Sequence, residues 1–292
     1  MKRCMLVLCC MMLAGMAFAN GRDDLRDRVQ ASMLVTGTIE VAPDGSVVTY
    51  TVDHPDKLPP VVKDLLARAV PAWRFEPVTR DGKAVGAKAP MGLRVVAKPV
   101  GHGGYALAVA SSWFGHLNDE GRHEAAADDF TYKHRLSVAY PSDAASAGVS
   151  GTVYALLKVG RDGKVIDAAA EQVNLRIRAS ERDMATWRKK LADAALRALR
   201  RYTFHVPTTG PDAAEPYWLA RVPVDFALHG FHAPKVARKA DYGQWQPYVP
   251  GPLQEPDWAD KRRLAGSPDA TPEDGSLLAD MSLHLLAPLG GS

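Results

Sequence analysis

The sequence predicts an α+β protein made of two small units that share one layout. In each unit two runs rich in β-branched residues flank an Asp-Gly pair, a helix with an apolar stripe follows, and a short aromatic run leads into a last strand. The Asp-Gly pairs at 44–45 and 162–163 lie 118 residues apart, whereas Phe75 and Phe204 lie 129 apart, so the second unit holds an insertion of 11 residues between its hairpin and its helix. Each unit is therefore expected to form an antiparallel sheet of about three strands packed on one helix.

The first unit is expected within residues 20–100. Glycine tolerates a positive φ, so Asp44-Gly45 predicts a hairpin turn between two strands. Pro60 can begin the helix because its position has no N–H bond to lose, and Pro71 ends the helix. The two hairpin strands, the segment that leaves the helix and the last strand are expected at 33–41, 46–52, 73–77 and 91–97.

The second unit is expected within residues 136–232, with its hairpin turn at 162–163. Ser180 with Asp183 resembles a helix-capping pair, and the helix is expected to continue to about Arg201. The two hairpin strands, the exit from the helix and the last strand are expected at 151–159, 164–173, 202–204 and 217–227.

The segments outside the two units differ in composition. Residues 1–19 combine a basic start, an apolar run and the small-x-small end Ala17-Phe18-Ala19, which predicts a signal peptide cleaved on export to the periplasm. All three cysteines lie in that segment, so no disulfide or cysteine metal site is expected in the remaining chain. A joining segment is expected at 101–135, where the alternation over 105–114 predicts a strand that extends the first sheet. The proline-rich stretch 233–292 predicts a mostly disordered tail.

No constellation of residues points to catalysis, a metal or a cofactor. The closest histidine pairs, His116 with His123 and His229 with His232, lack the helical spacing of metal motifs and are interpreted as loop residues. The net charge of +3 falls to +1 without Lys2 and Arg3, and a near-neutral chain argues against a nucleic-acid-binding protein. A non-enzymatic role is therefore expected.

A motif that opens the second unit carries a family resemblance. Tyr-Pro is followed by a short alanine-containing helix, then Gly-x-x-Gly-x-Val and Val-x-x-Asp-Gly-x-Val, and this pattern is similar to that of the TonB C-terminal domain family. The matching residues are Tyr140, Pro141, Gly148, Gly151, Asp162 and Gly163. The first unit lacks the Tyr-Pro start but carries the turn and the aromatic run of the family, at Asp44, Gly45, Trp73, Phe75 and Pro77.

This resemblance implies a protein or peptide partner. Members of the family usually transmit inner-membrane motor work to outer-membrane transporters, and they hold a transporter peptide by adding it to a sheet edge. An outer-membrane TonB-dependent transporter is thus one candidate partner. The implied edge is the last strand of the second unit, with Leu219, Arg221, Val222, Val224 and Phe226, and its equivalent in the first unit is 93–96. Pro223 cannot donate to a strand ladder, so it either limits an added strand or blunts the edge against aggregation.

Two functions stay open at this point. The chain shows no long proline-rich spacer before the first unit, and the apolar start lacks a Ser or His to engage a motor, which favours a periplasmic binding module. The alternative is a membrane-anchored energy transducer whose amino-terminal segment stays uncleaved. The second helix also has a basic face that suits either an anionic surface or plain solvent. That face comprises Arg182, Arg188, Lys189, Lys190, Arg197, Arg200 and Arg201. The sequence does not set the oligomeric state.

Overall fold

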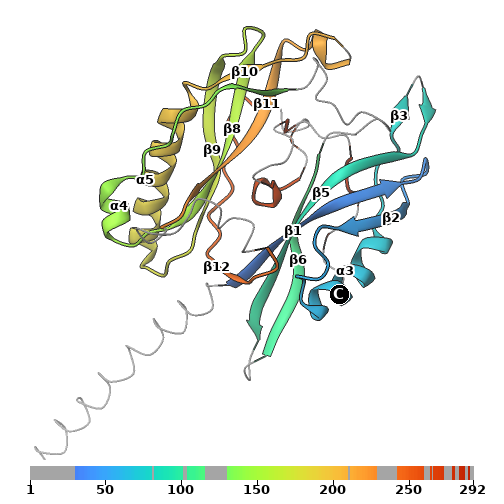
Figure 1. Ribbon diagram of the computed structural model, residues 1–292, viewed down its shortest axis with the longest axis horizontal. Helices are drawn as coiled ribbons and strands as arrows, with labels where there is room; N and C mark the ends of the chain where they lie inside the picture. The colour runs from blue at the N-terminus through green and yellow to red at the C-terminus, as the bar shows by residue number, and fades with distance from the viewer. Residues whose placement is uncertain are drawn as a thin grey trace, which may run out of the picture.

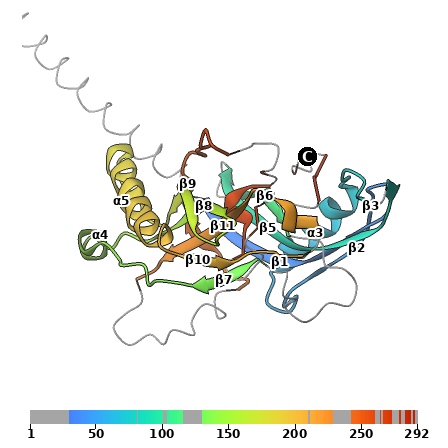
Figure 2. The same cartoon turned by 90° about the horizontal axis from the view of Figure 1, so that it is seen from above.

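The computed structural model describes residues 30–80, 82–100, 104–115, 130–209, 211–228 and 242–259, with shorter stretches at 264, 266–272, 278–279, 283–286 and 289. The predicted signal peptide lies outside the described residues. Two antiparallel sheets face each other, and segments from the end of the chain lie between them (Figure 1). Seen from above, helix α5 (Glu181–Leu199) lies at one end of the molecule and α3 (Pro60–Ala69) toward the other (Figure 2). The α+β fold class is confirmed.

The first sheet has the strand order β12-β1-β5-β6, and β2 also pairs with β1. All of these pairings are antiparallel, and β5 is an inner strand between β1 and β6. The expected extension of this sheet by the strand at 105–114 is confirmed as β6. The strands are β1 (Gln30–Val41), β2 (Val47–Val52), β5 (Ala87–Val100), β6 (Gly104–Phe114) and β12 (Gln246–Tyr248), and a small hairpin adds β3 (Thr79–Arg80) and β4 (Lys83–Ala84).

The second sheet has the order β11-β8-β9, with a separate two-stranded pairing of β10 and β7. In both units the first strand is central, its hairpin partner lies on one side and the last strand lies on the other, so the predicted strand–strand–helix–strand layout is confirmed. The remaining elements are β7 (Thr131–His134), α4 (Ser142–Ser146), β8 (Gly151–Gly160), β9 (Val165–Leu175), β10 (Thr203–His205) and β11 (Tyr217–Phe226).

The Asp-Gly turns of the two units make the same contact with their own units. Gly45 has φ 80° and Gly163 has φ 74°, a left-handed conformation that favours glycine. The N–H of Phe75 donates to the Gly45 carbonyl at 2.8 Å, and the N–H of Phe204 donates to the Gly163 carbonyl at the same distance. A Cβ at either glycine would lie within 1.9 or 2.2 Å of that phenylalanine's carbonyl oxygen. The duplication therefore extends from topology to a single hydrogen bond.

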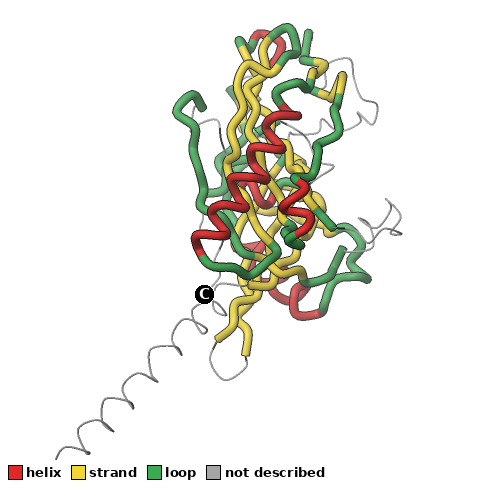
Figure 3. Tube along the Cα trace, turned by 90° about the vertical axis from the view of Figure 1, so that its left-hand side faces the viewer, coloured by secondary structure: helices red, strands yellow, loops and turns green. Residues whose placement is uncertain are grey.

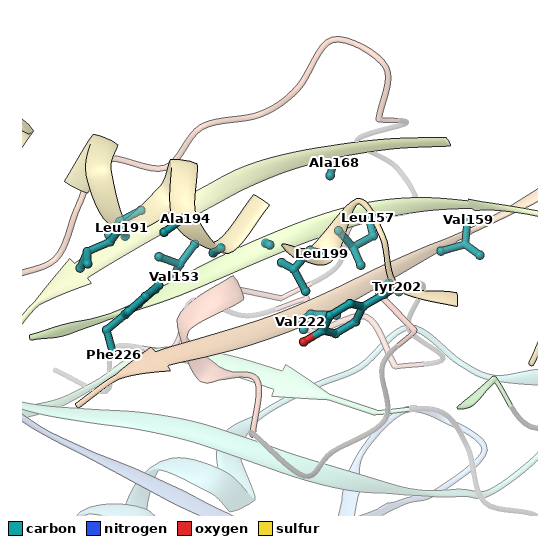
Figure 4. Close-up of a cluster of buried hydrophobic side chains, with 14 of the residues drawn as sticks. Val153, Leu157, Val159, Ala168, Leu191, Ala194, Leu199, Tyr202, Val222 and Phe226 are labelled. Carbon is teal, nitrogen blue, oxygen red and sulfur yellow. The ribbon is translucent and has the colours of Figure 1, made fainter. Parts of the chain in front are cut away.

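Helix α5 lies across one face of the second sheet (Figure 3). Its start is fixed as expected, because the Ser180 hydroxyl accepts a bond from the Asp183 N–H at 3.2 Å. Leu191 and Leu199 on the helix point toward Val153 and Leu157 of β8 (Figure 4), and all four are fully buried. Removing such side chains from water is the main source of stability here, at roughly 1.5–3 kcal/mol for each.

The predicted mostly disordered tail is wrong for the described parts of 233–292. Strand β12 pairs with the start of β1, and Val249 exchanges two backbone bonds with Leu175 of β9, at 2.9 and 3.0 Å. The tail therefore bonds to both sheets within four residues. Proline breaks the side-chain periodicity on which the prediction depended. Backbone pairing with an existing sheet edge needs no such periodicity.

Asp269 of the tail connects the two sheets through a buried polar cluster. Its side chain is 3% exposed and accepts bonds from Ser111 of β6 at 2.7 Å, from Asn174 of β9 at 3.4 Å and from the Tyr248 hydroxyl. Burial and the neighbouring carboxylate raise the pKa of Tyr248 far above its ordinary value, so this phenol stays a donor. Arg94 of β5 donates to the Asp269 carbonyl and, at 3.0 Å, to the Tyr154 hydroxyl.

Candidate functional site

The edge implied by the resemblance, β11, is covered at one end by the tail, and most of the side chains named for it are buried within the protein. Leu219 is fully buried, and its carbonyl accepts a bond from the Ala279 N–H of the tail at 2.7 Å. Arg221 forms a buried ion pair with Glu171. Val222 and Phe226 are 3% exposed and belong to the core under α5, and Val224 is half-buried beside them. A partner strand along all of β11 would therefore have to displace the tail at Leu219, and it would find most of these side chains already packed inside the protein.

Pro223 interrupts the outer row of backbone groups on β11. The Leu219 carbonyl points away from β8, and the β11–β8 register is unbroken, so every second residue along β11 also points outward. Pro223 is one of those residues and therefore removes no bond from the inner ladder. It leaves the outer row without a donor just beyond the part that the tail covers. This position favours the blunting interpretation over the binding one.

The equivalent edge of the first unit, 93–96, is not an edge, because β5 pairs with β1 on one side and β6 on the other. The expectation that it offers a free edge is wrong. The cause is the extra strand, which the second unit lacks in the described residues.

The family-motif residues of the second unit have structural roles. The Tyr140 hydroxyl donates to the Val149 carbonyl, and its ring meets Phe226 edge-on at 5.3 Å. Pro141 is the residue before α4, and Gly148 follows that helix with φ 69°. A Cβ at Gly151 would lie 2.4 Å from a carbonyl oxygen of β9. Each residue thus fixes the entry to β8, and none faces an open site.

The remaining motif residues fix the turns and the first core. The Ser46 hydroxyl and N–H lower the pKa of Asp44, and the Lys164 N–H does the same for Asp162, because each donates to the carboxylate. The rings of Trp73 and Phe75 pack against Phe114 at 6.2 and 4.9 Å, whereas Pro77 is exposed.

The amino-terminal half of β6 presents a sheet edge that the described residues leave uncovered. This half, Gly104–Val109, belongs to the β5–β6 hairpin, which projects past the body of the protein (Figure 3). Tyr105 is 66% exposed, and Val100 across the hairpin is 47% exposed. No other described residue forms a hydrogen bond with the outer side of this stretch. Cover begins only at Ser112, whose carbonyl accepts the Ser267 N–H at 2.9 Å.

The direction of the β6 backbone groups follows from a hydrogen bond made by Pro90 of β5. The Pro90 carbonyl accepts the Gly115 N–H, so Pro90 faces β6. The β1–β5 register is unbroken, so the direction of the backbone groups alternates regularly along β5. The backbone groups of Val95, Ala97 and Pro99 therefore point to the β1 side instead. The β6 residues opposite these positions must then point outward. They are Tyr105, Leu107 and Val109.

The signal for this edge was present in the sequence as a strand without gatekeeper residues. Between Pro99 and Gly115 the chain has no Asp, Glu, Lys or Arg, and the strand itself contains no proline. Natural edges usually carry such residues to prevent pairing. The sequence predicted the strand as an extension of the first sheet, but the resemblance assigned the candidate edge to the last strand of each unit, so it did not point to β6 as a binding edge.

Most of the basic face of α5 is engaged within the protein. Arg188 and Arg200 donate to backbone carbonyls, and Lys189 and Lys190 pair with carboxylates of Asp193 and Asp143. Arg182, Arg197 and Arg201 are exposed. Binding to an anionic surface stays a prediction that rests on these three.

The described part of the chain contains no cluster of three or more metal-ligating side chains. The four histidines considered above lie outside the described residues. In the described stretches, no helix is long and apolar enough to cross a membrane. In the comparisons with known proteins, no family model, no curated protein and no solved structure matches this chain.

Proposed function

We propose that this protein is a non-enzymatic binding module of the periplasm that holds an extended protein segment by strand addition to a sheet edge. The edge is the outer side of β6 over Gly104–Val109. A strand added there would meet backbone donors and acceptors at every second residue, which supplies affinity, while the alternate side chains select the partner.

The outer row of backbone groups on β6, which no described residue covers over Gly104–Val109, carries this proposal. Two other outer strands receive bonds from elsewhere in the chain, β9 at Leu175 and β11 at Leu219, and the turn just before β2 (Val47–Val52) is bonded at Gly45 by Phe75. The β6 row is continuous over three outward-facing positions and has no proline. The unpaired groups of such a row are a template for another strand.

Residue-resolved amide exchange tests the proposal. The probe is a lysine-flanked peptide of alternating Val and Thr, added to dilute protein. We expect exchange at Tyr105, Leu107 and Val109 to slow when the peptide is present, and exchange at Ala106 and Ala108, which face β5, to stay slow throughout. The variant Leu107→Pro should lose the effect, because it removes one outward N–H and no bond to β5. Fast exchange at the three outward positions under every condition would refute strand addition at β6.

A further inference from the structure

We propose that the partner of the β6 edge is a second copy of this chain, paired antiparallel across a twofold axis at Leu107. This inference rests on the proposed function, because it names the strand that the edge receives. It is carried by the symmetry of the outward positions, by the absence of charge and by the exposure of the hairpin.

The outward-facing residues are symmetric about Leu107. An axis at that residue places Leu107 opposite its own copy and Tyr105 opposite Val109 of the second copy. Each outward N–H of one strand then meets an outward C=O of the other, as the pairing of an antiparallel ladder requires. A twofold interface demands such self-complementarity, since the same patch must serve both sides.

The side chains also match across the axis. Leu107 is half-buried and would meet an identical apolar side chain. Tyr105 would lie opposite Val109, which is 3% exposed and belongs to the first core, and aromatic with β-branched residues form a favourable cross-strand pair. The Tyr105 ring is 66% exposed, so it has apolar area to bury in such a pair.

The absence of Asp, Glu, Lys and Arg on β6 suits self-pairing. Self-pairing of β6 brings no ionised groups together, because none lies between Pro99 and Gly115. A foreign peptide would more often be selected by charge complementarity, which the β6 edge does not offer.

Sedimentation equilibrium of the full mature chain, at about 1–100 μM, tests the proposal against the affinities expected of modest interfaces. The wild-type chain should form dimers that dissociate on dilution. Leu107→Pro should weaken dimerisation roughly a hundredfold, because a twofold interface loses two backbone bonds and two leucine contacts. Circular dichroism establishes that the variant is folded, and Leu107→Lys gives a second variant that keeps the N–H.

The matched control is Val48→Lys, which puts the same charge on β2 at a side chain that is 64% exposed. Unchanged dimerisation in this variant, with loss in both Leu107 variants, supports the proposal. Loss in Val48→Lys alone would overturn it in favour of β2. A wild-type chain that stays monomeric, yet whose β6 amides are protected by the Val-Thr peptide, would overturn the second copy as partner and leave strand addition standing. A monomer without peptide protection would remove both proposals.

Discussion

Removing Arg221 should destabilise the protein by about 3–5 kcal/mol, because its partner Glu171 would be left charged and buried. Arg221 on β11 reaches across β8 to Glu171 on β9. It donates from Nε to one carboxylate oxygen at 2.8 Å and from a terminal nitrogen to the other at 3.0 Å. The two side chains are 3% and 4% exposed, so water does not solvate the charge that remains when its partner is removed.

The double variant separates the charge from the packing. Arg221→Met combined with Glu171→Leu replaces the pair by apolar side chains of similar size, and such replacements are often neutral or stabilising. We therefore expect the double variant to unfold within about 1–2 kcal/mol of the wild-type chain, with a coupling energy of about 4 kcal/mol or more between the two sites, since either single change should cost about 3–5 kcal/mol. The exposed pair of Lys189 with Asp193 on α5 serves as control and should couple by only about 0.3–0.5 kcal/mol.

Urea unfolding followed by circular dichroism measures all four variants of the cycle. The free energies of unfolding are compared between variants whose slope m, the dependence of that free energy on urea concentration, is unchanged. A change in the unfolded chain is then not mistaken for a change in the folded one. A loss below about 1 kcal/mol in Arg221→Met, or an additive double variant, would refute the buried ion pair and with it the assignment of Arg221 to internal structure.

Three further outcomes are expected. Gly163→Ala and Gly45→Ala should each lower the melting temperature, by about 2–8 °C for a loss of roughly 1–2 kcal/mol, because each adds a Cβ at a positive φ against a carbonyl oxygen; unchanged melting would contradict the shared turn contact. Pro223→Ala should leave the free energy of unfolding within about 0.5 kcal/mol of wild type, whereas Val222→Pro should cost about 3 kcal/mol or more because its N–H faces β8; equal losses by urea unfolding would invert the assigned direction of β11. Mass spectrometry of the protein from periplasmic extract should give an amino terminus at Asn20, and an intact first segment in the membrane fraction would favour the energy transducer instead.

The sequence predicted the parts of the fold that depend on local chemistry. The two Asp-Gly turns, the prolines that bound α3 and the Ser180 cap each act within a few residues, so their signals survive without knowledge of the rest of the chain. The duplicated layout followed from repeating those local signals at a nearly constant offset.

The candidate site depended on relations that local patterns do not carry. The segment from Leu219 to Phe226 reads as the last strand of its unit, yet the tail segment at Leu278–Ala279 pairs with it at Leu219 and Ala220 from far along the chain. A proline-rich segment shows no periodicity whether it is free or bonded to a sheet. The sequence therefore favoured β11 as the open edge, and only the pairing of distant segments points to β6 instead.

The attachment of β12 has a consequence for how the chain reaches its folded state. Gln30 begins the first strand and Tyr248 pairs with it from near the other end, while the next residue, Val249, closes the edge of the second sheet. In a chain synthesised from its amino terminus, most of both sheets is therefore complete before β12 and Val249, in the last fifth of the chain, can join them. Contacts of such long sequence separation form slowly, and the waiting edges of β1 and β9 are open to wrong partners in the meantime. A protein cut after residue 241 would keep α3, α4, α5 and both Asp-Gly turns, but it would lack β12 and Val249 and would be left permanently in that intermediate condition.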